Sequence, residues 1–252
     1  MHGHINAETV GIIHSIETCG TVDGPGIRYV IFTQGCPLRC VYCQNPDTWA
    51  ANGSGASRKT VSKLMQDILK YKSYFRFSGG GVTLTGGEPL MQKEFSLGLF
   101  ASCKREGLHT VLDTSGYCDI DGLTEDILKV TDLVLLDVKS VNPDTYKKTT
   151  GFPIGKTLRF ARHLSETGIE TWIRFVLIPG LTDDDAELHD LAAYLTGLKN
   201  VGRVSVLPFH QMGAYKWQNL GFKYQLIGTP TPTDEETERV REMFRGYGLV
   251  VR

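Results

Sequence analysis

The chain has 252 residues, 41% of them hydrophobic, so it is long enough to bury one full core. Its 27 Lys and Arg against 28 Asp and Glu leave a net charge of −1, which gives no electrostatic reason to expect nucleic acid or an anionic membrane as partner. No apolar run is long enough to span a bilayer, and Met1–Val10 does not resemble a secretory signal, so we expect a cytoplasmic protein.

Short β-rich runs alternate along the chain with longer amphipathic runs. The predicted strands are Tyr29–Thr33, Val82–Thr85, Thr110–Asp113, Leu133–Asp137, Thr171–Leu177 and Arg203–Leu207. The predicted helices lie near Ser62–Ser73, Glu94–Glu106, Leu123–Val130, Lys156–Thr167, Asp184–Leu198 and Asp234–Tyr247. This succession of strand–helix units predicts an α/β fold with a parallel sheet and right-handed crossovers.

Two architectures fit this pattern, a partial open (β/α)6 barrel and an open doubly wound sheet, because the units are too few for a closed eight-stranded barrel. In both, functional groups gather where the strands end. Polar or glycine-rich clusters do follow the predicted strands, at 34–43, 85–89, 113–116, 137–139, 179–185 and 208–211. No composition shift or low-complexity tract marks a boundary, so we predict a single domain over residues 1–252.

Three of the six cysteines, Cys36, Cys40 and Cys43, lie in one short loop after the first predicted strand. Cysteine thiolates are the preferred ligands of iron–sulfur clusters, and three ligands leave one iron of a [4Fe-4S] cluster open to another molecule. Structural zinc is the alternative, but such sites usually show two C-x-x-C pairs and this chain has one. Its fourth ligand would come from Cys19, Cys103, Cys118 or His109. We predict a cluster, with the remaining cysteines as ordinary buried or half-buried thiols.

The spacing C-x3-C-x2-C at 36–43 resembles the cluster motif of the radical S-adenosylmethionine (SAM) superfamily. The upstream segment 21–28 (TVDGPGIR) resembles the motif of the branch that activates glycyl-radical enzymes. Further resemblances follow in chain order at 85–89, 112–116, 137–139, 172–174 and 207–210. The resemblance implies a partial open (β/α)6 barrel with one [4Fe-4S] cluster, bound through the three cysteines, and SAM as cofactors.

By this resemblance, the methionyl part of SAM binds the open iron and contacts two segments that follow strands. Gly86, Gly87 and Glu88 are expected to grip its amine, because bare backbone can approach a ligand closely there. The second segment is Asp137–Lys139, which includes Val138. The Asp137 carboxylate can accept hydrogen bonds from the ribose hydroxyls, and the Lys139 ammonium can pair with the methionyl carboxylate. We expect Asp137 and Lys139 to alternate on one strand and share a face.

The adenosyl part is expected beside Tyr42, Cys43 and Gln44, and beside His210 after the last strand. Tyr42 could instead only pack the loop. Many relatives carry histidine in place of Gln44, which leaves open whether its side chain contacts the cofactor.

Two further groups are candidates for binding. Asp113 and Thr114, close to Asp137 if the strands are neighbours, could bind SAM or a small cation through their oxygens, and helix capping or an Asx turn is the alternative. The resemblance also implies that the loop containing Asp23 lines the entrance for a glycine-bearing peptide of a partner enzyme.

The resemblance implies hydrogen abstraction from a backbone glycine of a protein partner, with reduced flavodoxin or ferredoxin as electron donor. Activating enzymes for glycerol or choline lyases often carry an inserted, cysteine-rich segment. Here Ala50–Thr60 contains no cysteine, which favours pyruvate formate-lyase as the partner. A noncatalytic metal-binding or redox-sensing module and a radical enzyme acting on a small metabolite remain the alternatives.

Overall fold

The computed structural model describes residues 7–53 and 55–252, so Met1–Val10 is described only from Ala7 onward. The chain has an α/β fold, and hydrogen bonds order its strands β3-β1-β2-β4-β5-β6-β7-β8 in an open sheet. The strands are β1 (Val10–Gly20), β2 (Arg28–Thr33), β3 (Ser57–Thr60), β4 (Gly81–Gly86), β5 (His109–Thr114), β6 (Leu133–Asp137), β7 (Thr171–Leu177) and β8 (Val201–Pro208). The predicted fold class is confirmed, and every predicted strand is present.

Most of the predicted helices are present in the described residues, together with helices at Pro143–Thr150 and Ala214–Asn219 that the sequence did not predict. They are α1 (Val61–Ile68), α2 (Lys72–Ser78), α3 (Lys93–Arg105), α4 (Gly122–Lys129), α5 (Pro143–Thr150), α6 (Gly155–Thr167), α7 (Asp185–Thr196), α8 (Ala214–Asn219) and α9 (Asp234–Gly246). The single helix predicted over Ser62–Ser73 is wrong, because a 3-10 turn at Leu69–Tyr71 separates α1 from α2. None of these helices is long and apolar enough to cross a bilayer.

The predicted all-parallel sheet is wrong at its amino-terminal edge. Strand β1 pairs antiparallel with both β2 and β3, while β2–β4, β4–β5 and β7–β8 are parallel. Strand β1 is only partly covered: Ile13 is buried, but Ser15 and Glu17, beyond an irregularity in its pairing with β2, are exposed. A half-exposed antiparallel strand carries polar residues that a search for buried strand–helix units passes over.

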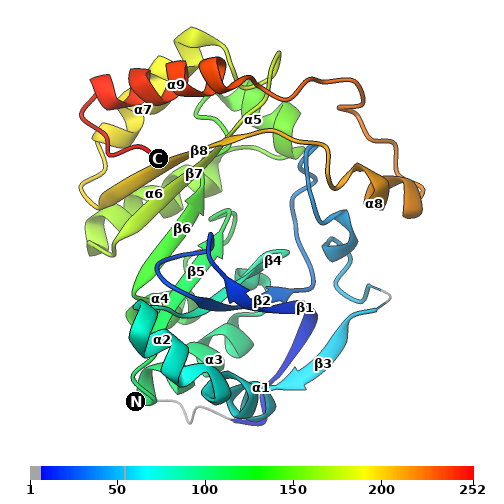
Figure 1. Ribbon diagram of the computed structural model, residues 1–252, viewed down its shortest axis with the longest axis vertical. Coiled ribbons are helices and arrows are strands. Elements are labelled where there is room, and N and C mark those ends of the chain that lie inside the picture. The colour runs from blue at the N-terminus through cyan, green and yellow to red at the C-terminus, as the bar shows by residue number, and fades with distance from the viewer. Residues whose placement is uncertain (1–6, 54) are drawn as a thin grey trace. The chain divides into compact units, whose positions relative to one another are not determined.

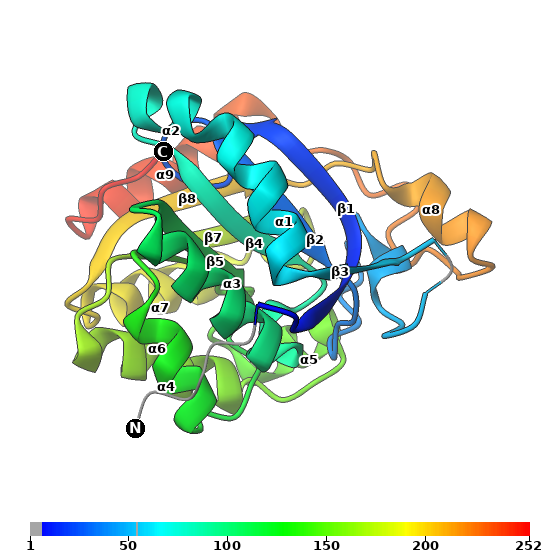
Figure 2. The same ribbon diagram turned by 90° about the horizontal axis from the view of Figure 1, so that it is seen from below.

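The chain divides into two compact units. Unit 1 comprises 1–37, 48–114 and 118–135, and unit 2 comprises 38–47, 115–117 and 136–252. In unit 1, β2 and β4 are almost wholly buried, as expected of parallel strands covered on both faces. Helix α3 packs against both α1 and α4, and it contacts β5 and β1 (Figure 2). In unit 2, α9 packs against β8 and against α7 (Figure 1).

A buried arginine fixes the loop that precedes β2. Arg28 is fully buried; its Nε donates to Thr83 Oγ1 (2.9 Å) and its Nη1 to Pro25 O (3.4 Å). The Thr83 hydroxyl in turn donates to Asp23 O (2.7 Å). Burial lowers the pKa of Arg28 to about 10, which leaves the guanidinium charged at neutral pH. The backbone of the loop around Asp23 is therefore held against β2 and β4.

Candidate active site

The loop with the three predicted cluster ligands crosses from one unit to the other. Cys36 belongs to unit 1, whereas Cys40 and Cys43 belong to unit 2. None of the six cysteines, all of which lie in the described residues, forms a disulfide. Across 7–53 and 55–252, no three His, Cys, Asp or Glu side chains are already grouped as metal ligands. The donor set nevertheless suits an iron–sulfur cluster, since it consists of three reduced thiols spaced along one loop.

Backbone hydrogen bonds hold this loop inside each unit. In unit 1, Gly35 N donates to Thr48 O (2.7 Å). In unit 2, Val41 N donates to Thr149 O (2.9 Å) at the carboxyl-terminal turn of α5. The loop is therefore fixed on both sides of Cys40.

The Cys40 thiol is buried in unit 2. Burial raises its pKa, and the nearby Lys139 ammonium acts against that rise. The thiol therefore keeps its proton at neutral pH until a metal displaces it. Of the cysteines predicted to be ordinary thiols, Cys103 and Cys118 are buried, but Cys19 is exposed and that part of the prediction is wrong. Cys19 lies on the uncovered side of β1.

Lys139, Asp137 and Tyr42 come together in unit 2. Lys139 Nζ lies 3.1 Å from Asp137 Oδ2 and 5.4 Å from the centre of the Tyr42 ring, and its side chain is almost fully buried. Burial alone would lower the pKa of Lys139, but the Asp137 carboxylate, and Tyr42 and Cys40 once they are ionised at high pH, hold it well above its ordinary value. The expected alternation on one strand is wrong, because β6 ends at Asp137. The ion pair, not a strand face, brings the two charged groups together.

Gln44 uses its side-chain amide within the protein. Its Nε2 donates to Tyr42 O (3.2 Å) and to His210 O (3.0 Å), and its Oε1 accepts from Gly213 N (2.7 Å). A Cβ at position 213 would lie 2.7 Å from the Gln44 Cα, so glycine is required there. Gln44 therefore fastens the cysteine loop to the segment that follows β8.

We expect Gln44→Ala to lower the free energy of unfolding by about 1–3 kcal/mol, because it removes hydrogen bonds that each contribute roughly 0.5–1.5 kcal/mol. Urea denaturation of the metal-free protein measures this change. Gln66→Ala, at an exposed position of α1, is the matched control and should change stability by less than about 0.5 kcal/mol. Equal stability of the two variants would contradict the fastening role.

Helix α8 adds two contacts to the cysteine loop that the sequence did not predict. Trp217 Nε1 donates to Cys43 O (2.9 Å), and Lys216 Nζ donates to Asn45 Oδ1 (2.8 Å). In each contact the two residues lie more than 170 positions apart along the chain. A helix of six residues also leaves only a weak periodic pattern in the sequence. Gly213 and Trp217 are the residues of the sequence that could have pointed to this helix.

In unit 1, the Gly86–Glu88 turn packs against the residue before Cys36. Glu88 N donates to Gly35 O (2.7 Å), and a Cβ at Gly87 would lie 2.1 Å from that oxygen. The Glu88 side chain is buried, and its Oε1 accepts from Thr114 Oγ1 (2.7 Å). This turn and the start of the cysteine loop therefore form one close-packed piece of unit 1.

Gly87→Ala should displace Gly35 and with it Cys36, because backbone rather than a flexible side chain blocks the new methyl group. We expect iron incorporation to fall at least about tenfold, as outer contacts of metal ligands are typically worth 10–100-fold in affinity. Iron and sulfide analysis after anaerobic reconstitution measures it. Gly122→Ala, where a Cβ meets no atom within 4 Å, serves as control. Full iron content in the Gly87 variant would show that the loop tolerates the displacement.

Asp113 and Thr114 both lie in β5, and the next helix is capped by Asp121, so helix capping is not their role. Asp113 Oδ2 accepts from Thr85 Oγ1 (2.6 Å) at the end of the neighbouring strand. Unit 1 therefore places both residues beside the segment that ends in Glu88. The third predicted cation ligand, Asp137, belongs to unit 2.

His210 follows β8 and belongs to unit 2. Its Nδ1 is buried and has no hydrogen-bond partner in the described part of the chain. Buried polar atoms in proteins are nearly always hydrogen-bonded, so this nitrogen suits a polar group of a ligand.

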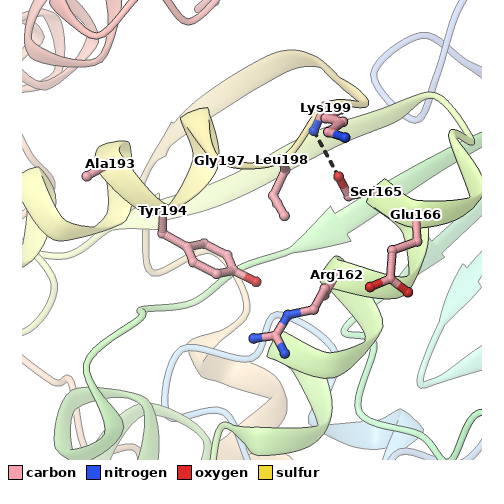
Figure 3. A pocket seen from close by; sticks show the side chains of 8 residues that line it. All are labelled: Arg162, Ser165, Glu166, Ala193, Tyr194, Gly197, Leu198 and Lys199. Atoms are coloured by element: carbon pink, nitrogen blue, oxygen red, sulfur yellow. Dashed lines mark hydrogen bonds between the residues drawn. The ribbon is translucent and has the colours of Figure 1, made fainter.

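A cavity of about 440 Å³ lies between α6 and α7 in unit 2 (Figure 3). It is lined by Arg162, Ser165, Glu166, Ala193, Tyr194, Gly197, Leu198 and Lys199. The Lys199 amide donates to Ser165 Oγ at its rim (2.8 Å). None of the predicted site residues lines this cavity, so it is not the candidate active site.

Comparison with known proteins identifies similar sequences over nearly the whole chain. The family model described as the Radical SAM superfamily matches residues 30–192. The chain is 43% identical over 240 residues to the pyruvate formate-lyase 1-activating enzyme of Escherichia coli (strain K12), covering 95% of this chain and 97% of that protein. It is 48% identical over 231 residues to the pyruvate formate-lyase-activating enzyme of Staphylococcus aureus (strain USA300), covering 89% and 91%.

Solved structures share the fold. A domain of the pyruvate-formate lyase-activating enzyme from Bacteroides vulgatus ATCC 8482 matches with a TM-score of 0.59 and 24% identity, covering 69% of this chain and 98% of that one. Streptococcus suis SuiB bound to S-adenosylmethionine matches with a TM-score of 0.65 and 18% identity, covering 88% and 49%. Both likenesses support the open α/β architecture.

Proposed function

The chain belongs to the radical SAM superfamily and, within it, to the pyruvate formate-lyase-activating enzymes, and we propose that it generates a glycyl radical on pyruvate formate-lyase. Membership of the superfamily implies a [4Fe-4S] cluster and SAM. When bound, the reduced cluster would supply the electron that breaks a carbon–sulfur bond of SAM and releases methionine, and the remaining 5′-deoxyadenosyl group would take a hydrogen atom from the glycine. The cysteine loop carries the proposal, since three reduced thiols in C-x3-C-x2-C spacing leave one iron for SAM.

We assign the charged and glycine-rich groups to the methionyl and ribose parts of SAM. Lys139, almost fully buried and charged, would bind the carboxylate, and Asp137 the ribose hydroxyls. Backbone groups of the turn at Gly86 and Gly87 would bind the methionyl amine, and the buried carboxylate of Glu88 would balance its charge. Val138 would contact SAM through its backbone. Its N–H donates to Arg174 O and so holds this backbone in place.

The adenosyl part of SAM would lie along unit 2. Tyr42 offers an aromatic face already covered on one side by Lys139, and His210 offers the buried Nδ1 that has no partner in the described residues. Gln44 would act by holding this segment in place, because its amide is engaged with Tyr42, His210 and Gly213. Asp23 would line the entrance for the partner's glycine-bearing peptide, on a loop whose backbone Arg28 fixes.

Asp113, Thr114 and Asp137 would bind a small cation next to SAM through hard oxygen donors. Reduced flavodoxin or ferredoxin would deliver the electron. The reduced thiols fit a cytoplasmic location. The two compact units would work as one domain over residues 1–252.

Anaerobic incubation of the reconstituted protein with SAM, a chemical reductant and purified pyruvate formate-lyase tests the function. We expect 5′-deoxyadenosine and methionine as products and a glycyl radical signal by electron paramagnetic resonance. A glycyl radical signal with a glycerol or choline lyase, and none with pyruvate formate-lyase, would show that the other lyase is the partner. Modification of a small molecule in the absence of a protein partner would indicate a metabolite substrate. Absence of SAM cleavage would indicate a noncatalytic module.

A further inference from the structure

The segment 212–227 of unit 2, which contains α8, exposes a group of large apolar side chains. These are Met212, Tyr215, Leu220, Phe222 and Ile227, and we call them the α8 surface. Met212 and Ile227 are the most exposed of the five, at 72% and 75%. Gln211 Nε2 donates to Thr229 O (2.7 Å), so the two ends of the segment lie side by side. Apolar side chains exposed as a group indicate an interaction site, whereas single ones do not.

The α8 surface is joined directly to the cysteine loop. Phe222 packs on the Trp217 indole with ring centres 6.4 Å apart, and Trp217 Nε1 donates to Cys43 O (2.9 Å). One indole therefore separates the exposed Phe222 ring from the backbone of a predicted cluster ligand. Gly213 N, directly after Met212, donates to Gln44 Oε1 (2.7 Å) in the same loop. Because electron tunnelling slows steeply with distance, a surface this close to the cysteine loop is suited to an electron donor.

The charge of the α8 surface favours an acidic partner. Residues 209–233 include two lysines and no aspartate or glutamate. Lys216 is paired with Asp47 (3.1 Å), whereas Lys223, next to Phe222, is exposed. An apolar centre with a polar rim is the usual anatomy of a protein–protein interface, and complementary charge steers the two proteins together. The surface therefore suits a carrier protein with an acidic face.

We infer that the α8 surface is the docking site of the protein electron donor, an acidic carrier of single electrons of the flavodoxin or ferredoxin class. This inference rests on the proposed function, because it requires the cluster. In the docked complex one electron leaves the reduced carrier and enters the oxidised cluster, so the carrier is oxidised and the cluster reduced by the same electron. Such redox encounters are brief and use small interfaces, which a patch on one short helix and its flanking loops can supply.

Stopped-flow reduction of the full-length, anaerobically reconstituted protein by reduced flavodoxin, and in parallel by reduced ferredoxin, tests the inference. In Met212→Ser/Ile227→Ser we expect the second-order rate constant with the faster carrier to fall about tenfold, because apolar anchors of the interface are lost. Both side chains are exposed in the free protein, so iron content and reduction by dithionite should stay at the wild-type level. Phe77→Ser, at an exposed apolar residue of α2 in unit 1, is the matched control and should keep the wild-type rate.

Lys223→Glu tests the charge separately. At an ionic strength of about 0.01 M it should slow reduction by the carrier several-fold, because the variant repels an acidic face. At about 1 M salt the Debye length is only about 3 Å, so the difference from the wild-type protein should disappear. Reduction by dithionite at a fixed salt concentration again reports whether the cluster itself is intact.

Wild-type rates with the carrier in the Met212/Ile227 double variant, or an equal loss in Phe77→Ser, would overturn the inference. So would a wild-type cluster that neither carrier reduces. Normal reduction by the carrier, combined with less glycyl radical on pyruvate formate-lyase when dithionite is the reductant, would show that the surface holds the protein substrate instead. A wild-type protein that takes up no iron and sulfide, or forms no glycyl radical with dithionite, would remove the proposed function, so the two failures are distinguishable.

Discussion

Cys40→Ala should reduce SAM cleavage to background, because the cluster loses one of its three protein ligands. Cys40 is the middle ligand, it is buried, and the loop around it is held by the Val41–Thr149 hydrogen bond. Iron and sulfide content should fall together with 5′-deoxyadenosine production, both measured after anaerobic reconstitution.

Cys19→Ala is the matched control for this experiment. Cys19 lies on the exposed side of β1 and has no ligand spacing to another cysteine, so its removal should leave iron content and SAM cleavage at the wild-type level. Substantial SAM cleavage by the Cys40 variant, or uptake of zinc in preference to iron by the wild-type protein, would contradict the assignment of the loop.

The central strands could be predicted from the sequence because local pattern decides them. Leu133–Asp137 and Thr171–Leu177 match β6 and β7 to the residue, since each is a short apolar or alternating run bounded by polar residues. Strand β1 could not be recognised in the same way, because its exposed face carries His14, Ser15 and Glu17. Its pairing with β2 is a long-range contact that no local periodicity encodes.

Helix α5 shows a different kind of omission. Its start was readable, since Asn142 caps it through hydrogen bonds to Asp144 N and Thr145 N, and Pro143 occupies the first turn. The helix has mainly polar residues and only eight positions, so hydrophobic periodicity gave no signal. A search for caps before periodicity would have found it.

For the site, the sequence predicted the residues that spacing and family resemblance define, and missed those that hold them. The three cysteines follow from one local motif. The Gln44 amide, by contrast, joins positions 166 and 169 residues away, and Trp217 reaches Cys43 from a distance of 174 residues. Such contacts depend on how the chain folds back, so only the three-dimensional structure could show that Gln44 is engaged with protein backbone.

Lys139→Met should weaken SAM binding about 10–100-fold, because one hydrogen bond to a charged group contributes roughly 1.5–3 kcal/mol. The pKa of Lys139 is raised, so its charge is fully present below the ordinary lysine pKa of about 10.4 and is lost only at still higher pH. The wild-type advantage over the variant should therefore be constant between about pH 6.5 and pH 8.5. Equilibrium dialysis of SAM against the cluster-loaded proteins measures both effects.

Two comparisons separate this role from a purely structural one. Lys156→Met removes a similar arrangement in unit 2, an ammonium 5.5 Å from the centre of the Tyr117 ring, and should leave SAM affinity unchanged. Asp137→Asn in the Lys139→Met background removes the carboxylate that the single variant leaves unpaired. If an unpaired Asp137 caused the loss, the double variant would bind SAM as tightly as Asp137→Asn alone. If Lys139 binds the methionyl carboxylate itself, the double variant binds SAM more weakly than Asp137→Asn alone, since the ammonium that neutralises the ligand is still missing.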